Sequence, residues 1–370
     1  MTIKLIGEPK VIMSNPNSRH DYFGWPSVAR LQNGKLAAVA SGYRLSHICP
    51  FGKAVISYSE DLGETWTIPA PVIDTVLDDR DAGITTFGDR GVVVTSFNNS
   101  IQFQRTHCFT AAYEEDAETA ALHAYTHAYL ALVPPKAEAA ALGSTFRISN
   151  DCGVTFGPLF HAPIMSPHGP TPLQDGSLLW VGRPFEDVPG VCYTHVYRME
   201  PNGAMEKLGE IEDIYDGEER LLSCEPHAIA LPDGRLICHI RVQRSYPTED
   251  RIFTTYQSVS EDGGYTWSKP EQLLAKRGGA PAHLLQLKNG LLISTYGYRL
   301  QPFGLRVMVS ADGGRTWEKD LVLCDGFPTG DLGYPATVEL DDGTLLTVFY
   351  AREIKDGPAL IMQVRWTLTD

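Results

Sequence analysis

Short runs of alternating apolar and polar residues, each ending in a Gly-containing turn, recur along the whole chain. The clearest unit spans residues 224–267. Its first run ends at Pro232-Asp233-Gly234, a second run returns, and another pair of runs follows. Asp-Gly turns between such runs are typical of β-hairpins. The unit is therefore predicted to be a four-stranded antiparallel sheet, one blade of a propeller.

The same hairpin turn occurs six times in the sequence. Its glycines are Gly34, Gly91, Gly176, Gly234, Gly290 and Gly343. Neighbouring glycines are 53 to 58 residues apart, except for one interval of 85 residues. A fixed period of this size indicates a repeat architecture. The expected fold is all-β, a six-bladed β-propeller with residues 1–370 as a single domain, in which residues 3–13 pair with residues 359–368 to complete blade six.

The long interval contains an Ala/Glu-rich segment, residues 111–142. Its composition favours helix, and Pro134-Pro135 is expected to interrupt it. The sequence therefore predicts a helical insertion in blade two. Because the segment lies between the inner and outer hairpins of that blade, it is expected on the same face as Glu225. There it would act as a helical cap or as a contact between subunits of a homo-oligomer.

Composition and charge narrow the classes of partner. The net charge of −14 argues against nucleic-acid and anionic-membrane binding, because both need broad positive surfaces. No apolar run approaches the ~20 residues of a membrane-spanning helix, and residues 1–7 are too interrupted for a signal-peptide core. Seven cysteines without a Cys-x-x-Cys pair are interpreted as reduced thiols. A cytoplasmic location is expected unless a leader has been removed.

Four outer turns share the pattern Ser-x-Asp-x-Gly-x-x-aromatic, at residues 59–66, 149–156, 260–267 and 310–317. Ser and Asp can bind the turn backbone, Gly supplies positive φ, and the aromatic ring fills the space between strands. We interpret these aspartates as structural, on the face opposite Glu225. The four copies resemble the Asp-boxes of the sialidase (neuraminidase) superfamily, and the chain resembles a six-bladed sialidase-like protein over nearly its whole length.

The resemblance implies roles for three residues. Glu225 and Arg241 stand where the family has a Glu at the start of blade four and an Arg at the end of the returning strand. Tyr334 matches the family's Tyr at the start of the last inner strand. In the family the Glu is the base for the Tyr, which attacks the anomeric carbon, while arginines hold the substrate carboxylate. A neutral phenol suits an anionic sugar because a carboxylate nucleophile would be repelled.

The chain departs from the family at two arginines. The family's Phe-Arg-Ile-Pro motif appears as Phe23-Gly24-Trp25-Pro26, so Gly24 replaces a carboxylate-binding Arg. A third family Arg is replaced by Gly304, with Arg299 and Arg306 nearby.

The family's acid/base Asp is missing as well. Residues 41–58, which include the blade-one loop, contain no Asp or Glu, and His47 is the nearest titratable residue. Asp81, at the start of an inner strand one blade away, is the better chemical match. A carboxyl beside apolar residues can hold its proton near neutral pH, whereas His47 suits proton abstraction or a polarising hydrogen bond.

Each inner hairpin returns to the face where it began, which predicts one common mouth. A ring of guanidinium groups at this mouth would suit a carboxylate or another anionic sugar substituent. The alternative is that some arginines pair with nearby carboxylates and only hold blades together. The side chains expected at the mouth are Trp25, Asp81, His168, Glu225, His283 and Tyr334 from strand starts, and Arg44, Arg183, Arg241, Arg299 and Arg352 from strand ends.

Several of these candidates have structural alternatives. Trp25 is either a sugar-stacking platform or a core plug, and His168 and His283 either transfer protons or satisfy loop carbonyls. His123 and His127 have i, i+4 spacing, but no third ligand is evident, so a solvated helix face is favoured and no metal is expected. The sequence contains no phosphate loop or nucleotide fingerprint, so no cofactor is expected.

The sequence thus predicts a sialidase-like glycoside hydrolase with a Glu-activated Tyr nucleophile, acting on a terminal, acidic sugar of a small-molecule or oligosaccharide substrate. Two alternatives remain open. One is a lyase-like glycan-cleaving enzyme in which His47 is the acid or base. The other is a carbohydrate-binding propeller that retains the scaffold without the chemistry.

Overall fold

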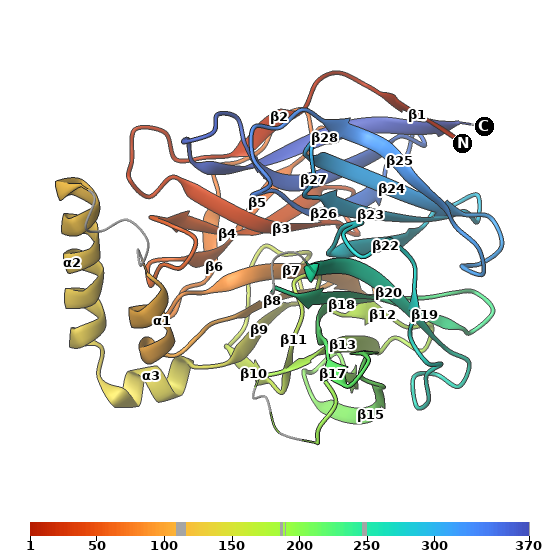
Figure 1. Cartoon of the computed structure of the whole chain (residues 1–370), viewed down its shortest axis with the longest axis horizontal. Helices are drawn as coiled ribbons and strands as arrows, with labels where there is room; N and C mark the ends of the chain where they lie inside the picture. Colours follow the sequence, from red (N-terminus) through yellow and green to blue (C-terminus); the bar gives the residue numbers. More distant parts are fainter. Residues whose placement is uncertain (109–115, 186–187, 189, 246–249, 370) are drawn as a thin grey trace.

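The computed structural model describes residues 1–108, 116–185, 188, 190–245 and 250–369. Six antiparallel sheets of four or five strands stand around a central axis, with the helices at one edge (Figure 1). This confirms the six-bladed propeller.

The first three blades follow the chain in order. Blade one contains β3 (Tyr22–Arg30), β4 (Leu36–Arg44), β5 (Lys53–Ser59) and β6 (Ala70–Ile73). Blade two contains β7 (Arg80–Phe87), β8 (Gly91–Phe97), β9 (Ser144–Ser149) and β10 (Phe160–Ala162). Blade three contains β11 (Ile164–Met165), β12 (Thr171–Pro172), β13 (Leu178–Pro184), β14 (Thr194–Met199) and β15 (Met205–Ile211).

A small hairpin of β16 (Tyr215–Asp216) and β17 (Glu219–Arg220) leads into the second half. Blade four contains β18 (Leu222–Ala230), β19 (Leu236–Arg244), β20 (Ile252–Ser260) and β21 (Glu271–Gln272). Blade five contains β22 (Ala282–Gln286), β23 (Leu292–Tyr298), β24 (Gly304–Ser310) and β25 (Glu318–Asp325). Blade six contains β26 (Gly333–Glu339), β27 (Leu345–Arg352), β28 (Ala359–Thr369), β1 (Thr2–Leu5) and β2 (Lys10–Met13).

The inner strands are apolar on both faces because neighbouring blades cover each sheet from both sides. The first seven residues of β4 are all buried, for example. Between blades one and two, Val39 and Ile56 pack in one cluster with Ile84 and Val92. The core therefore consists of layers between blades, and these layers hold the inner strand ends at fixed positions around the mouth.

The N-terminal strands complete blade six, as predicted. β1 pairs with β28 in the register Thr2 to Thr369, and β2 pairs with the earlier part of β28. The first and last described strands therefore close the ring by backbone hydrogen bonds.

The Asp-box turns have the expected local chemistry. In the turn after β20, Ser260 Oγ donates to Asp262 Oδ1 at 2.9 Å and accepts from the Gly264 amide at 2.9 Å. In the register of β19 and β20, Ser260 lies beside Leu236, whereas Thr255 lies beside Arg241. The turn is thus at the opposite end of blade four from Arg241, which confirms that the box and the mouth lie on different faces.

The insertion in blade two is helical, as predicted, but it begins earlier in the chain. It contains α1 (Ile101–His107), α2 (Ala117–Leu132) and α3 (Pro135–Ala141), between β8 and β9. The interruption at Pro134-Pro135 is confirmed, while residues 111–115 of the predicted segment lie outside the described residues. Figure 1 shows α2 standing beside the propeller, with α1 nearer the blades. Among the described helices, none combines the length and apolar character needed to cross a membrane.

One asparagine joins the two ends of the insertion. The Asn98 amide donates to the Gly143 carbonyl at 3.1 Å, and the Gly143 amide donates to Asn98 Oδ1 at 2.9 Å. Asn98 Nδ2 also donates to the Ala141 carbonyl at 2.9 Å. The chain therefore leaves and re-enters blade two at one fixed point next to the mouth.

Candidate functional site

Four blades begin with the same backbone irregularity. Strand pairing is interrupted at Trp25-Pro26, Asp81-Ala82, Glu225-Pro226 and Tyr334-Pro335. The first residue of each pair has a positive φ, between 47° and 53°. A non-glycine residue in this region costs roughly 1–3 kcal/mol, and such strain concentrates at functional sites. The repeated bulge explains why four side chains of different chemistry come to one mouth.

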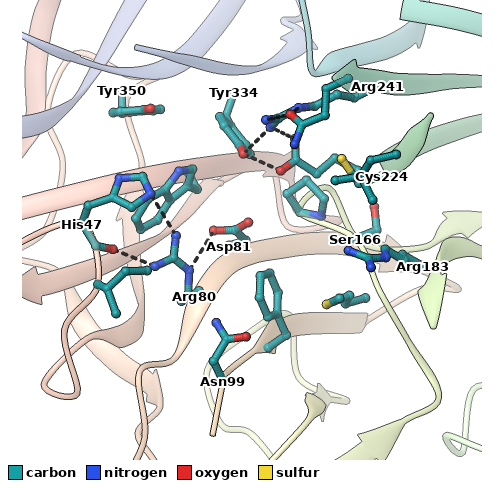
Figure 2. Close-up of a pocket in the computed structure, with 18 of the residues that line it drawn as sticks. His47, Arg80, Asp81, Asn99, Ser166, Arg183, Cys224, Arg241, Tyr334 and Tyr350 are labelled. Carbon is teal, nitrogen blue, oxygen red and sulfur yellow. Dashed lines mark hydrogen bonds and ion pairs between the residues drawn. The ribbon is translucent and has the colours of Figure 1, made fainter. Parts of the chain in front are cut away.

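All four bulge residues line a single pocket of about 450 Å³. This volume is in the range of sites for small molecules, roughly 300–1,000 Å³. Arg183, Arg241 and Arg299 also line it, as does His47. Most of the candidates from the sequence therefore lie around one cavity, which Figure 2 shows in close-up.

Glu225, Tyr334 and Arg241 line this pocket and form a hydrogen-bonded group. Figure 2 shows Tyr334 and Arg241 next to each other at one side of the pocket. The Tyr334 hydroxyl donates to Glu225 Oε1 at 2.6 Å. Arg241 Nη1 donates to Glu225 Oε2 at 2.5 Å and to the Tyr334 hydroxyl oxygen at 3.1 Å. Burial, and then the charge of Glu225, raise the pKa of Tyr334 well above its usual value. The phenol is therefore neutral and directed at a proton acceptor.

Two neighbours fix the position of the Arg241 guanidinium. Arg241 Nε donates to Gln243 Oε1 at 3.1 Å, and the guanidinium carbon lies 4.7 Å from the centroid of the Phe253 ring. With these contacts on its other edges, the group presents Nη1 to both the carboxylate and the phenol. Such a charge-assisted arrangement stabilises negative charge on the phenol oxygen.

Asp81 lies in the middle of the same pocket and is 4% exposed. Its Oδ1 has no hydrogen-bond partner among the described residues. The carboxylate forms a long ion pair with Arg80, whose Nε lies 4.0 Å from Oδ1. Burial raises the pKa of Asp81 to about 7; Arg80 opposes this shift and Glu225 adds to it. Near neutral pH a large fraction of this carboxyl carries a proton that it can donate.

Arg80 is a pocket residue that was not predicted from the sequence. Its guanidinium lies 4.2 Å from the centroid of the Trp25 ring, and Nη1 donates to the His47 carbonyl at 2.7 Å. It supplies a cation at the side of the mouth formed by Trp25. The charged run Asp78-Asp79-Arg80-Asp81, directly before an apolar strand, was the available signal, because such a run is buried only with paired charges.

Trp25 supports Arg80 and is not a platform for a sugar. The indole is only 1% exposed, and two guanidinium groups stack near it, Arg80 at 4.2 Å and Arg44 at 4.9 Å. Of the two alternatives from the sequence, the structure favours the core plug.

His47 lies beside Trp25 and Arg80, with part of its surface open to solvent. Partial desolvation of the ring, with the charges of Arg80 and Arg44 adding to its effect, lowers the pKa of His47 to about 3. Its Nδ1 is 3.2 Å from the Tyr22 hydroxyl. The imidazole is therefore neutral near pH 7, which makes it unsuited to protonate a leaving group.

Arg299 and Arg183 complete the positive wall of the pocket. Arg299 Nε donates to the Leu332 carbonyl at 3.0 Å, and its guanidinium lies 5.9 Å from the Tyr334 ring centroid. Arg183 lies 5.1 Å from the ring centroid of Tyr193. Both arginines lie at the mouth, as predicted from their positions at the ends of inner strands.

Two other arginines are not at this pocket. Arg44 is completely buried and pairs with Asp78 at 2.6 Å. Arg352 pairs with Asp331 at 2.9 Å and faces a neighbouring depression, although Asp331 itself lines the main pocket. The expectation that both arginines ring the mouth is corrected: Asp78 holds Arg44 in the interior, and Arg352 lies behind Asp331, outside the pocket lining.

His168 and His283 also lie elsewhere, in the interior between blades three, four and five. Together with His227 they form a buried group whose ring centroids are 4.4–5.2 Å apart. The Leu284 amide donates to His227 Nδ1 at 2.9 Å, and the Thr337 amide donates to His283 Nδ1 at 3.4 Å. The structure does not bring His168 and His283 to the pocket; the role it indicates for His283 is satisfying the backbone.

We expect this buried histidine group to make the protein sensitive to acid. Burial lowers the pKa of His283 to about 3, and those of His168 and His227 fall well below 6.5. Because the unfolded chain binds these protons more readily, unfolding takes up protons below pH 6.5. Asp79 and Asp81, whose pKa values burial raises to about 7, act in the opposite direction. The histidines outnumber them, so urea melts should give a free energy of unfolding that falls from pH 6.5 to 4.

A single substitution isolates this effect. His283→Gln should reduce the pH slope by about 1.4 kcal/mol per pH unit, the equivalent of one proton. The exposed His161 on β10 offers the matched control, and His161→Gln should leave the slope as it is. An unchanged slope in His283→Gln would contradict a cost of charging this ring.

In three of the four blades with a bulge, the residue opposite the start of the bulge also lines the pocket. Arg241, Phe97 and Tyr350 pair with the residue just before the bulge in blades four, two and six, and all three line the pocket. Phe97 and Tyr350 were not predicted, because only the arginines at these strand ends were taken as candidates. Asn99 and Phe103 line the pocket from the start of the insertion. They were missed because α1 was not expected.

Metal binding and a cysteine nucleophile have little support among the described residues. They contain no group of three His, Cys, Asp or Glu side chains placed to hold a metal ion. His123 and His127 lie next to each other on α2, with ring centroids 4.0 Å apart. Burial raises the pKa of Cys224 to about 12, so this pocket thiol is a poor nucleophile.

Comparisons with known proteins agree with the propeller. The family model described as BNR repeat-like domain matches residues 127–347, more than half of the chain. A search of curated proteins finds no match.

Solved structures give a similar result. A protein of unknown function from Dyadobacter fermentans is similar with a TM-score of 0.76 and 19% identity, covering 99% of each chain. The intramolecular trans-sialidase of Ruminococcus gnavus has a TM-score of 0.66 and 12% identity, covering 97% of each chain. The α-L-arabinanase of Penicillium chrysogenum has a TM-score of 0.61 and 16% identity, covering 99% of this chain and 98% of its own. At these identities the likeness concerns the fold.

Proposed function

We propose that this chain, which belongs to the family of BNR repeat-like domains, is a glycoside hydrolase that acts on an acidic sugar at the end of a glycan. The observation that carries the proposal is the 2.6 Å hydrogen bond from the Tyr334 hydroxyl to Glu225, inside a pocket lined by arginines. Two structural neighbours named as an intramolecular trans-sialidase and an arabinanase support a glycan as the substrate.

In this reaction Tyr334 is the nucleophile and Glu225 its base. The phenol oxygen forms a bond to the anomeric carbon as its proton passes to Glu225 Oε1, which already accepts it at 2.6 Å. Arg241 Nη1, 3.1 Å from the phenol oxygen, stabilises the negative charge that develops there. A buried phenol with a raised pKa is a weak nucleophile alone, so the adjacent carboxylate is needed to activate it.

Asp81 is the acid in the same step. As the bond between the anomeric carbon and the leaving oxygen breaks, the Asp81 carboxyl gives its proton to that oxygen. In the second step Asp81 takes a proton from water, the water oxygen bonds to the anomeric carbon, and Tyr334 leaves with the proton returned by Glu225. The pKa of about 7 suits a group that must both give and take a proton near neutral pH.

The arginines account for the preference for an acidic sugar. Arg80, Arg183 and Arg299 line the pocket around the reacting group. Arg241 also lines it but already forms an ion pair with Glu225. Guanidinium groups hold a carboxylate by paired hydrogen bonds. We therefore assign the carboxylate of the substrate to this positive wall.

A turnover screen with paired substrates tests the function. The 4-methylumbelliferyl glycosides of sialic acid, glucuronic acid, galacturonic acid, glucose and galactose allow each uronic acid to be compared with its neutral counterpart. We expect turnover of at least one acidic sugar and none of the neutral ones. Binding of an acidic sugar without turnover of any glycoside would favour a binding propeller. An unsaturated product would favour a lyase.

A further inference from the structure

The start of the insertion forms one wall of the pocket, and the reaction proposed above does not use it. Asn99, which follows β8, and Phe103 of α1 both line the cavity, next to Phe97 at the end of β8. This wall contributes two aromatic rings and one carboxamide, and it carries no charge. It therefore differs in chemistry from the arginine-lined part of the same pocket.

The position of this wall relative to the reacting groups follows from Figure 2. Tyr334 and Asn99 lie on opposite sides of Asp81 in the pocket. A nucleophile and a leaving group occupy opposite sides of the anomeric carbon in an in-line displacement, and the acid must reach the leaving oxygen. With Tyr334 attacking and Asp81 donating its proton, the leaving group departs toward Asn99.

The wall is held rigidly, as a binding surface requires. The Phe103 amide donates to Ser100 Oγ at 3.1 Å, and buried Gln104 donates through Nε2 to the Asn99 carbonyl at 2.7 Å. The Ile101 amide donates to Glu138 Oε1 at 2.8 Å, which ties α1 to α3. Together with the Asn98 bonds to Gly143 and Ala141, these contacts fix the backbone beneath both side chains.

The side chains themselves remain available to a ligand. No side-chain hydrogen bond of Asn99 is present within the described residues. Phe103 is 36% exposed, and its ring stacks on that of His107 with a centroid distance of 4.0 Å. Aromatic rings cover the apolar faces of sugars, and a carboxamide can both donate to and accept from sugar hydroxyls. A charged leaving group would find no opposite charge on this wall.

We propose that Asn99, Phe103 and Phe97 form a subsite for the leaving group and that this subsite takes an uncharged pyranose ring. The proposal rests on the glycosidase function proposed above for the direction of departure. The insertion thereby determines which glycan is cleaved, whereas the arginine wall determines which terminal sugar is released.

Binding and turnover together test this subsite. Saturation-transfer NMR with the methyl glycosides of glucose, galactose and mannose measures occupancy by a neutral pyranose without any reaction. We expect at least one to bind the unmodified protein, and Asn99→Ala and Phe103→Ala to weaken that binding at least fivefold. Tyr334→Phe, on the far side of Asp81, should bind the same sugar as well as the unmodified protein does. Thermal melts should show that both wall variants are folded.

Turnover separates this proposal from the function on which it rests. For the acidic sugar found by the screen, Phe103→Ala should raise KM at least fivefold when the leaving group is a neutral hexose. It should change KM less than twofold when the leaving group is fluoride, which cannot reach the wall. Equal KM values for hexose glycosides in Phe103→Ala and the unmodified enzyme would overturn the subsite and leave the hydrolase intact. Absence of turnover, with neutral-sugar binding that still depends on Asn99 and Phe103, would overturn the hydrolase and retain the binding site.

Discussion

Tyr334→Phe should lower kcat for the preferred acidic glycoside by on the order of 10³-fold. The substitution keeps the ring that packs in the pocket but removes the oxygen that bonds to the anomeric carbon. KM should change little, since the arginine wall is untouched. Initial rates with a 4-methylumbelliferyl glycoside, together with binding of the free sugar by calorimetry, separate these two quantities.

Two further variants test whether the loss of kcat is due to the Tyr334 oxygen and its base. Glu225→Gln should have a loss of similar size, because an amide cannot take the phenol proton. Tyr350→Phe is the matched control, since Tyr350 lines the same pocket but its hydroxyl donates to Asp331 at 3.0 Å and does not contact Glu225. It should stay within about tenfold of the unmodified rate. A Tyr334→Phe protein that keeps a tenth of its activity would exclude the phenol as nucleophile.

Asp81→Asn is expected to separate substrates by their leaving groups. Sugars linked through an alcohol need protonation of the departing oxygen, so their turnover should fall by roughly 10²–10⁴-fold. Aryl glycosides with acidic phenols need little protonation and should keep most of their rate. A series of glycosides with leaving groups of graded pKa measures this difference.

The pH dependence gives an independent check on the same residue. The acid form of Asp81 is required, and burial raises its pKa to about 7, so turnover of alkyl glycosides should decline as pH rises through about 7. Asp81→Asn should abolish that decline. His47→Ala should be milder for both substrate types, because the His47 ring is already neutral. The reverse ranking of the two variants would indicate the lyase-like route.

The fold could be predicted because its determinants are local and repeated. Five Asp-Gly or Asn-Gly turns each specify a hairpin through their own backbone preferences, and with Asp89-Arg90-Gly91 they make six turns along the chain, which leaves few alternatives. Closure through residues 3–13 followed from the same logic. The start of α1 could not be found in this way, because Ile101 and Phe103 suit a strand as well as a helix, and the Ser100 cap that decides between them is a single residue.

The same difference between local and long-range determinants separates the site residues that could be predicted from those that could not. Glu225, Asp81 and Tyr334 could be placed because the bulge repeats at the same point of each blade. The partners of Arg44 and Arg352 could not, because each depends on which carboxylate of a neighbouring loop lies nearest. Asp78 and Asp331 are 34 and 21 residues away from these arginines in the chain. Pairing over such distances is a property of the assembled blades.

The pairing of β1 and β2 with β28 also bears on how the molecule is assembled. Blades one to five each consist of a continuous stretch of chain, so they can form during synthesis as the ribosome releases them. Blade six joins residues 2 and 369, which are far apart in the sequence, so the ring remains open until β28 has been synthesised. A circularly permuted gene that links these neighbouring strands and opens a loop between two other blades would convert that last event into a local hairpin.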